Sequence, residues 1–198
     1  MVTAIDMVGT NLGSGTKTYI VNFCKQLEHL KINKDIYIFI CKDSLKEISA
    51  IKNNHVKYIK KTNILKNTLL RILWMQFILP FELKFLKVTQ LYSPMNIGPI
   101  FIKFFKIRFI LGLHSNLPWL FFSKMPGNII RNYITKLLMQ FSIYFCDHLI
   151  VMSENAKKEI VRILSLDSKK VSSIYLGVDE IYLKNDTKSN VVKNFNYS

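Results

Sequence analysis

The chain opens with Val2-Thr-Ala-Ile-Asp-Met-Val-Gly-Thr-Asn-Leu-Gly-Ser-Gly-Thr-Lys-Thr18 and continues into Tyr19-Ile-Val-Asn-Phe-Cys-Lys-Gln-Leu27. The apolar start predicts a strand, and the apolar spacing from Tyr19 predicts a helix. The small residues between them allow a tight backbone turn. This order of strand, glycine-rich loop and helix indicates an α/β fold in which the first N–H groups of the helix face any ligand that docks there.

Two common phosphate-binding motifs do not fit the glycine-rich loop. A Walker A motif has glycine directly before its Lys-Ser/Thr pair, whereas Thr16 precedes Lys17 here. A dinucleotide-binding fingerprint has a third glycine where this chain has Thr18. The residues of the loop therefore leave two interpretations open, an anion-binding helix start and a plain turn.

Two kinds of apolar segment alternate along the rest of the chain, one typical of strands and one of helices. The alternation predicts a Rossmann-like, doubly wound parallel sheet with right-handed crossovers. Pro80 should kink its helix because proline has no N–H to donate, and Ser153 should cap the helix that follows it. Strands are expected at residues 2–8, 35–41, 56–61, 89–93, 107–113, 148–152 and 171–176, and helices at 19–30, 44–53, 68–86, 128–145 and 154–164.

Ligands of such parallel sheets bind outside the carboxyl ends of the strands. No histidine pair has the spacing of metal ligands, and no paired carboxylates suggest a glycoside hydrolase. We therefore expect no metal and no other cofactor. The loops that the rule selects as candidate binding segments are residues 9–17, 94–99, 114–119 and 153–155.

The net charge of the 198 residues is +15. Such a charge suggests an anionic partner, which is a nucleic acid, an anionic membrane surface or a phosphorylated substrate. A biased genome composition rich in Lys, Ile and Asn also explains part of the charge. Because no recognition helix or RNP-like motif is present, no nucleic-acid partner is expected.

The three cysteines, at positions 24, 41 and 146, lie far apart and form no C-x-x-C pair. This pattern argues against a disulfide framework or a zinc site and favours reduced thiols in the cytoplasm. Asp6 and the glycines interrupt the N-terminal apolar run, so no signal peptide is expected. The longest apolar segment, residues 97–113, is broken by three cations and is not expected to span a bilayer.

Four motifs follow in order near the ends of the expected strands. They are Leu91-Tyr-Ser-Pro-Met-Asn96, Phe109-Ile-Leu-Gly-Leu-His-Ser-Asn116, Cys146-Asp-His-Leu-Ile-Val-Met-Ser-Glu-Asn-Ala-Lys-Lys158 and Val171-Ser-Ser-Ile-Tyr-Leu-Gly-Val-Asp179. With the Gly-Ser-Gly loop, and with Trp74-Met-Gln76 before Pro80, their order resembles the N-terminal, acceptor-side domain of family 4 retaining glycosyltransferases. The resemblance implies one half of a GT-B architecture at residues 1–182, and a linker or the start of a C-terminal donor domain at 183–198.

The resemblance also implies roles for residues at these strand ends. His114 matches a histidine that lies beside the transferring sugar and is the candidate catalytic residue, although Ser115 replaces the aspartate usual after it. A lone histidine is also commonly structural, and a first-turn carboxylate such as Glu154 is also explained by the helix dipole alone. The residues implied to bind the donor phosphates or the acceptor are Gly13, Ser14, Gly15, Asn96, Ser115, Asn116 and Glu154.

The function implied by the resemblance is that of a nucleotide-sugar-dependent retaining glycosyltransferase of the hexosyltransferase type. Its expected acceptor is a glycan or a lipid-linked glycan of the cell envelope. In this family a C-terminal domain holds most of the nucleotide-sugar, through a motif of two glutamates that this sequence lacks. We therefore expect a truncated or split enzyme that is inactive alone and needs a C-terminal-domain partner. The alternative is a non-catalytic, membrane-docked Rossmann-like module that partners a separate donor-domain chain.

Basic and aromatic residues interleave in the segment Ile100-Phe-Ile-Lys-Phe-Phe-Lys-Ile-Arg-Phe109. Such a segment suits an anionic membrane surface, with its rings at the headgroup level. A peripheral position on the inner face of the cell membrane is therefore expected. The alternative places the phenylalanines of this segment in the core and the cations in water. The residues predicted to contact the membrane are Lys103, Lys106 and Arg108.

Overall fold

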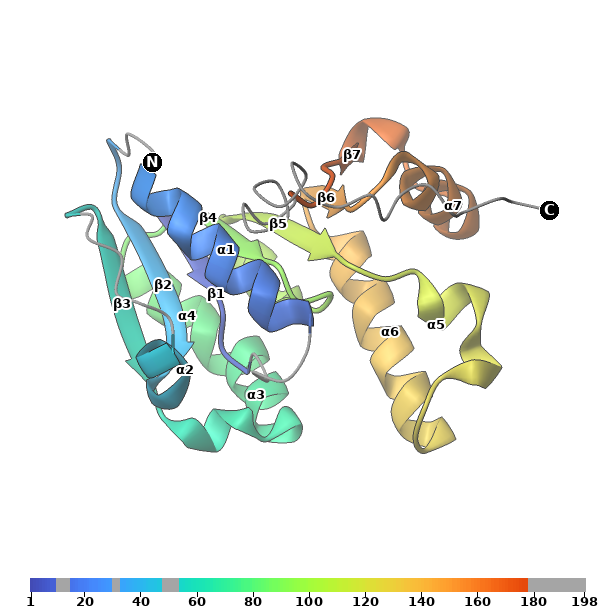
Figure 1. Ribbon diagram of the computed structural model, residues 1–198, viewed down its shortest axis with the longest axis horizontal. Helices are drawn as coiled ribbons and strands as arrows, with labels where there is room; N and C mark the ends of the chain where they lie inside the picture. Colours follow the sequence, from blue (N-terminus) through green and yellow to red (C-terminus); the bar gives the residue numbers. More distant parts are fainter. Residues whose placement is uncertain (10–14, 30–32, 48–53, 178–198) are drawn as a thin grey trace, which may run out of the picture.

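The computed structural model describes residues 1–9, 15–29, 33–47 and 54–177, which form a seven-stranded sheet flanked by helices (Figure 1). The strand order is β3-β2-β1-β4-β5-β6-β7, and every neighbouring pair is parallel. The predicted doubly wound parallel sheet is therefore confirmed. The strands are β1 (Thr3–Asp6), β2 (Ile36–Cys41), β3 (Val56–Lys61), β4 (Gln90–Ser93), β5 (Arg108–Leu113), β6 (His148–Val151) and β7 (Val171–Ser173).

Helices and short helical turns connect the strands. Ser153 caps its helix as predicted, because the Ala156 N–H donates to Ser153 Oγ at 3.1 Å. The helices are α1 (Gly15–His29), α2 (Lys42–Glu47), α3 (Thr68–Leu73), α4 (Leu79–Phe85), α5 (Leu117–Leu120), α6 (Ile129–Phe145) and α7 (Glu154–Leu164). The turns are η1 (Asn63–Lys66), η2 (Trp74–Ile78), η3 (Ile100–Phe105), η4 (Phe122–Lys124) and η5 (Ser168–Lys170).

Alternation along β1 divides the core into two layers, one on each face of the sheet. Ile5 and Met7 pack with Cys24 and Leu27 in a cluster that α1 covers. Ala4 belongs to the opposite cluster, which α4, α6 and α7 cover. Figure 1 shows α1 on one face of the sheet and α4 on the other. Right-handed crossovers require this division, because the chain winds from β1 to β3 in one direction and from β3 to β7 in the other.

The helix predicted as one piece at residues 68–86 is three segments in the structure. Between α3 and α4, η2 is a π-helical turn in which the Leu79 N–H donates to the Trp74 carbonyl. Pro80 has no N–H, and its ring crowds the preceding carbonyls, so the helix widens before it. The kink predicted at Pro80 is thus a π turn. The helix predicted at residues 44–53 begins earlier, at Lys42, and its residues 48–53 lie outside the described part of the chain.

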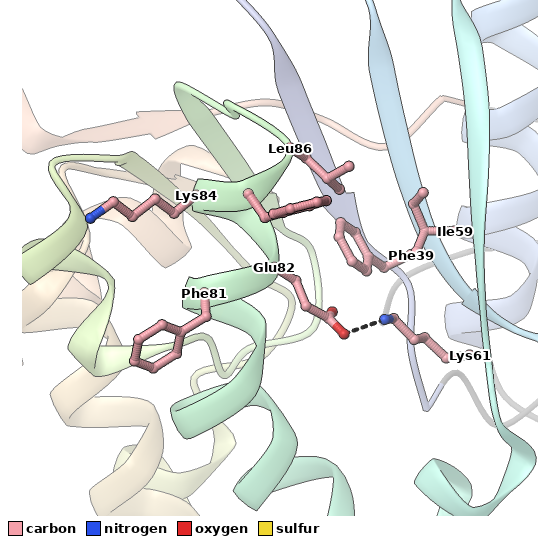
Figure 2. Close-up of a pocket in the computed structure, with 8 residues that line it drawn as sticks. Phe39, Ile59, Lys61, Phe81, Glu82, Lys84 and Leu86 are labelled. Carbon is pink, nitrogen blue, oxygen red and sulfur yellow. Dashed lines mark hydrogen bonds and ion pairs between the residues drawn. The ribbon is translucent and has the colours of Figure 1, made fainter.

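An ion pair joins the edge strand β3 to α4 (Figure 2). Lys61 Nζ lies 2.5 Å from Glu82 Oε1, and the same ammonium lies over the rings of Phe39 and Trp74, 5.3 and 5.6 Å from their centroids. Both charged side chains are mostly shielded from water. The ion pair therefore fixes the position of α4 relative to β3.

The buried side chain of Gln76 fixes the loop after β4. Its Nε2 donates to the Gly98 carbonyl at 3.1 Å, and its Oε1 accepts from the Ile100 N–H at 2.8 Å. Ser142 of α6 completes this polar centre, because its Oγ accepts from the Gly98 N–H at 3.1 Å. Gly98 is required there, since a Cβ would lie 2.1 Å from the Phe109 ring. Three separate segments thus meet at one glycine.

Substitution of Gln76 by leucine should destabilise the protein by about 2 kcal/mol, because it leaves the Ile100 N–H without its partner. Urea denaturation measures the change in the free energy of unfolding. The control is Gln26→Leu on the exposed side of α1, which should change stability by less than about 0.5 kcal/mol. Equal effects of the two substitutions would contradict the assigned role of Gln76.

Candidate functional site

The carboxyl ends of β1 and β4 form the topological switch point of the sheet. The chain continues from β1 toward β3 on one side and from β4 toward β7 on the other, so the loops after these adjacent strands diverge. Crevices at such points are the usual ligand sites of doubly wound sheets. Residues Gly9, Pro94–Asn96 and His114 lie at or next to this edge.

The structure brings two of the predicted site residues, Asn96 and His114, into direct contact. The His114 backbone N–H donates to Asn96 Oδ1 at 2.6 Å. Asn96 has a left-handed backbone with φ of 63°, and its own N–H donates to the Gly112 carbonyl at 3.0 Å. Asparagine tolerates this backbone better than most residues. The loop after β4 therefore positions the residue that follows β5.

The His114 ring is half-buried and neutral at pH 7. Burial lowers the pKa of His114, and a hydrogen bond to the backbone of Pro94 opposes that shift. Since proline has no N–H, the ring donates this bond to the Pro94 carbonyl. The ring packs edge-on against Tyr19 with 4.8 Å between centroids, and Nε2 is buried with no partner among the described residues. A neutral ring nitrogen of this kind can bind a sugar hydroxyl.

Tyr19 packs against His114 and shares a hydrogen bond with Tyr92, and neither tyrosine is among the residues predicted from the sequence. Their hydroxyl oxygens lie 2.7 Å apart. Burial is the main cause of a raised pKa for both phenols, so both stay protonated at neutral pH. In the sequence, Tyr19 counted only as an apolar position of the first helix, and Tyr92 as part of a strand motif. Only their hydroxyl groups, close in sequence to the predicted binding loops, indicated a role other than packing.

A buried carboxylate and an arginine support the start of the glycine-rich loop. Asp6 Oδ1 accepts from the Val8 N–H at 3.0 Å. Arg71 of α3 donates from Nη1 to the Gly9 carbonyl at 3.4 Å. Gly9 has φ of 82°, and a Cβ there would lie 2.3 Å from Arg71 Cδ. Burial raises the pKa of Asp6 to about 6, against the opposing effects of the Val8 hydrogen bond and the Arg71 charge.

Gly13, Ser14, Gly15 and Ser115 are four more of the predicted ligand residues. Gly13 and Ser14 lie outside the described residues, and Gly15 is the first residue of α1. Ser115 Oγ accepts from the Leu117 N–H at 3.1 Å. Helix α1 therefore begins at a predicted ligand residue, and the first N–H groups of a helix suit an anion. Their binding roles remain predictions.

Asn116 and Glu154 connect the loops after β5 and β6 to neighbouring elements. Asn116 Nδ2 donates to the Ala156 carbonyl at 3.1 Å and to Glu159 Oε2 at 3.2 Å, which ties the start of α5 to α7. Glu154 accepts a hydrogen bond from Ser173 Oγ of β7. These contacts alone explain why polar side chains stand at positions 116 and 154. Their predicted roles in ligand binding stay predictions.

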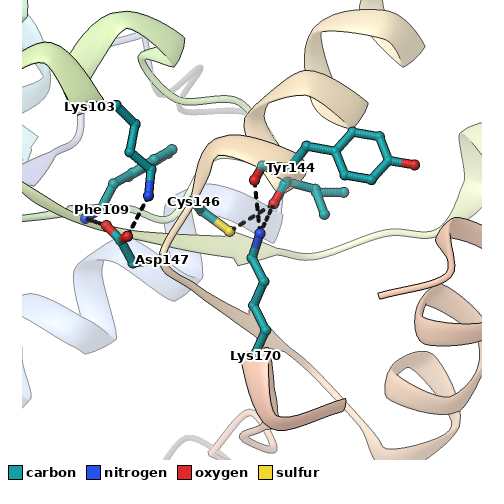
Figure 3. Close-up of polar contacts among 7 residues, drawn as sticks. Lys103, Phe109, Tyr144, Cys146, Asp147 and Lys170 are labelled. Atoms are coloured by element: carbon teal, nitrogen blue, oxygen red, sulfur yellow. Dashed lines mark hydrogen bonds and ion pairs between the residues drawn. The ribbon is translucent and has the colours of Figure 1, made fainter. Parts of the chain in front are cut away.

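The three cations predicted to contact a membrane lie at the amino end of β5, away from the His114 edge. Lys103 Nζ lies 2.5 Å from Asp147 Oδ1, and the Phe109 N–H donates to Asp147 Oδ2 at 2.7 Å (Figure 3). Burial raises the pKa of Asp147, but these two hydrogen bonds and the Lys103 charge lower it overall. The residues lining the hollow of about 380 Å³ at this point are Lys103, Lys106, Ile107, Arg108 and Asp147.

The alternative that placed the nearby phenylalanines in the core is wrong for Phe104, which is 82% exposed, and for Phe101, which is also exposed. No helix in the described part of the chain is long and apolar enough to cross a bilayer. Among the same residues, no cluster of His, Cys, Asp or Glu is suited to hold a metal ion.

A doubly wound sheet with polar side chains gathered at its switch point defines an α/β domain of the kind that usually binds ligands at its carboxyl edge. A family model for glycosyltransferase family 4 matches residues 13–181, so the chain belongs to this family. No curated protein matches the chain.

Solved structures with this fold include two enzymes of different chemistry. The chain is 17% identical to the lipopolysaccharide outer core galactosyltransferase WaaB, with a TM-score of 0.55, over 90% of this chain and 46% of that one. It is 16% identical to the UDP-GlcNAc 2-epimerase from Methanocaldococcus jannaschii, with a TM-score of 0.52, over 88% of this chain and 45% of that one. The chain thus spans less than half the length of these proteins, and the likeness shows the fold alone.

Asp6 should make stability depend on pH. Its folded pKa of about 6 exceeds the ordinary value of 3.8, so folding favours the protonated form. This contribution to stability is present below pH 4 and is lost as the pH rises through 6. Asp6→Asn keeps the oxygen that accepts from Val8 but does not titrate. The variant should match the wild type near pH 4 and exceed its stability by about 2–3 kcal/mol at pH 7.

Denaturant titrations of both proteins between pH 4 and 7 measure this difference, because the other carboxylates are common to both and cancel. A stability difference that does not change with pH would show that Asp6 titrates normally in the folded protein.

Proposed function

We propose that the chain is the acceptor-side half of a nucleotide-sugar-dependent retaining glycosyltransferase that acts in lipid-linked or cell-envelope glycan synthesis. One observation carries the proposal. In a chain of glycosyltransferase family 4, a neutral histidine lies at the switch-point edge, held there by Asn96, and its Nε2 has no partner among the described residues.

His114 and α1 have separate tasks in this proposal. His114 Nε2 hydrogen-bonds a hydroxyl of the transferring sugar, and the neutral ring matches an uncharged partner. The donor phosphates lie toward the amino end of α1, where Gly15 begins a helix of 15 residues. Arg71 donates to the carbonyl of Gly9, the last described residue before the glycine-rich segment. No metal ion is required, because backbone N–H groups and the helix dipole meet the phosphate charge.

A second, donor-binding domain completes the proposed enzyme. The sequence lacks the spaced glutamates with which the family holds the nucleotide-sugar. Catalysis by positioning needs both halves of the cleft, since orientation supplies a large part of the rate. We propose that this half comes from further residues of the same polypeptide or from a partner chain.

The fold alone does not select transfer over other chemistry, since the same fold occurs in a galactosyltransferase and an epimerase. Family membership and the His114 site favour transfer. The second candidate function is a non-catalytic module that docks a separate donor-domain chain at a membrane. The exposed aromatic surface described below favours this second candidate, and activity of the assembled protein distinguishes the two.

The test of transfer uses the chain alone and together with a family 4 donor-binding domain. The chain alone should transfer no sugar from a panel of nucleotide-sugars to a membrane extract. With the donor domain, transfer should appear, and His114→Ala should lower its rate about ten-fold or more because a hydrogen bond to the sugar is lost. The matched control is His148→Ala, since His148 is also half-buried but bonds Ser172 on β7.

If the assembled protein transfers sugar equally fast in the His114→Ala and His148→Ala variants, His114 is not part of the site. Robust transfer by the chain alone would overturn the need for a donor-binding half.

We also propose a peripheral position on the cytoplasmic face of the membrane, supported by the outer surface of η2, α4 and η3. Phe77, Phe81 and Phe85 lie four residues apart and form one stripe along the helix, with exposed fractions of 57%, 64% and 87%. Phe77 stacks on Phe101, and the ring centroids lie 5.6 Å apart. The stripe therefore joins the basic and aromatic segment of η3, and aromatic rings next to cations suit a membrane interface.

Replacing Lys103, Lys106 and Arg108 together by glutamine should weaken binding to vesicles of anionic phospholipid. Each cation near an anionic surface contributes about 1 kcal/mol, so the partition coefficient should fall by about two orders of magnitude. Co-sedimentation measures it, and added salt should weaken wild-type binding. The matched control replaces Lys157, Lys158 and Arg162 of α7, which removes the same charge elsewhere. Equal losses in both triple variants, or equal binding to neutral vesicles, would contradict this docking surface.

A further inference from the structure

An apolar groove of about 680 Å³ lies between α4 and the outer strands of the sheet. In Figure 2, Phe39 and Ile59 face Leu86 across this groove, and Glu82 reaches Lys61 at one end. Its volume falls within the range of small-molecule sites. The lining residues are Phe39, Ile59, Lys61, Phe81, Glu82, Lys84, Phe85 and Leu86.

The groove exists because α4 covers only the inner part of this face of the sheet. Leu79 and Leu83 of α4 belong to the core cluster that includes Phe39 of β2. Ile59 of the edge strand β3 packs against the same cluster but stays half-buried. Among the described residues, no helix lies over the outer side of β3 on this face. An apolar strip thus remains open along the helix.

Two of the three charged residues that line the groove, Lys61 and Glu82, balance one another, and Lys84 carries the remaining positive charge. Lys61 pairs with Glu82 at 2.5 Å and lies over the Phe39 ring. This pairing leaves no net charge against the apolar walls. A ligand that covers an ion pair loses less binding free energy than one that covers an isolated charge, because the isolated charge would lose its water without compensation. The walls therefore fit a hydrocarbon chain better than a polar ligand.

The groove is continuous with the proposed membrane surface through α4. Phe81 and Phe85 belong both to the groove lining and to the exposed stripe. Phe81 packs edge-on against Phe105 of η3 at 4.9 Å, and Lys84 Nζ lies 5.8 Å from the centre of the same ring. Figure 2 shows Phe81 and Lys84 on the side of α4 turned away from Phe39 and Ile59. Helix α4 thus lies between the groove and the basic, aromatic face, and Phe81 and Lys84 form the rim of the groove on the side of that face.

We propose that this groove binds the hydrocarbon chain of an anionic lipid taken from the membrane on which the protein docks. Lys84, at the rim, matches the negative headgroup, and the walls of Phe39, Ile59 and Leu86 take the chain. The inference rests on the membrane docking proposed above. A peptide fits less well, because the lining side chains offer its backbone few hydrogen-bond partners.

The experiment uses Trp74 as an internal reporter. Trp74 lies behind the groove, with its ring centroid 6.1 Å from that of Phe39, and Trp119 is the only other tryptophan of the sequence. In the Trp119→Phe protein, a fatty acid brominated in mid-chain, added below its micelle concentration, should quench most of the Trp74 fluorescence, because bromine quenches at short range. The unbrominated fatty acid is the control for indirect effects.

Filling the groove by Ile59→Phe should weaken the apparent affinity for the brominated fatty acid at least ten-fold. The matched control is Ile64→Phe on the exposed η1 turn, which should leave it unchanged. If Ile59→Phe lowers the unfolding midpoint, Leu86→Phe replaces it as the filling variant. Absence of quenching, or equal quenching in the filled and control variants, overturns the groove as a lipid site.

Two readouts separate this inference from the proposed membrane docking. The triple glutamine variant of Lys103, Lys106 and Arg108 should lose vesicle binding and keep the quenching by monomeric fatty acid. That result supports a groove distinct from the docking cations. Vesicle binding without quenching overturns the groove alone, whereas loss of quenching in the triple variant overturns the separation of the two sites.

Discussion

The amide of Gln76 is the contact on which the geometry of the candidate site depends. It fixes the Gly98 carbonyl and the Ile100 N–H, and Ser142 fixes the Gly98 N–H. These hydrogen bonds hold the last part of the loop after β4, at Gly98 and Ile100, against η2 and α6. In the same loop Asn96 adopts its left-handed backbone and accepts from the His114 N–H. A buried side chain on the helical layer thus positions a histidine at the edge of the sheet.

Polar atoms without partners gather at the same edge. Arg71 Nε and His114 Nε2 are buried and lack a hydrogen bond among the described residues, and Asp6 is fully buried nearby on β1. Buried polar groups are normally satisfied, because an unmade hydrogen bond costs about 1–3 kcal/mol. Functional sites commonly contain such buried polar atoms without hydrogen bonds.

The two helical layers differ in what they expose. The α1 layer buries Cys24 and Leu27, whereas α4 buries Leu79 and Leu83 but leaves its phenylalanine stripe open. Large exposed apolar surfaces are uncommon on monomeric domains and mark surfaces of interaction. Because the stripe runs along α4 and α4 lies along the sheet, a bilayer on this layer would lie beside the sheet and leave the His114 edge accessible from one end.

The sequence by itself determined the order of strands and helices, the parallel sheet and the loops that carry the candidate site. Apolar periodicity is local, and parallel connections constrain the rest, so these features follow without knowledge of contacts. The family resemblance drawn from the ordered motifs was confirmed over residues 13–181. The position of His114 at a strand end also followed from its motif.

Only the tertiary structure decided which apolar residues are buried and which distant residues meet. Helical spacing placed Phe77, Phe81 and Phe85 on one face, but periodicity does not tell whether another element covers that face. The contact of Tyr19 with His114, and the hydrogen bond between Tyr19 and Tyr92, join segments far apart in the chain. Such contacts depend on how the layers pack, which no local pattern records. The hydrogen bond from Arg71 to the Gly9 carbonyl likewise joins segments far apart in the chain, and only the fold shows it.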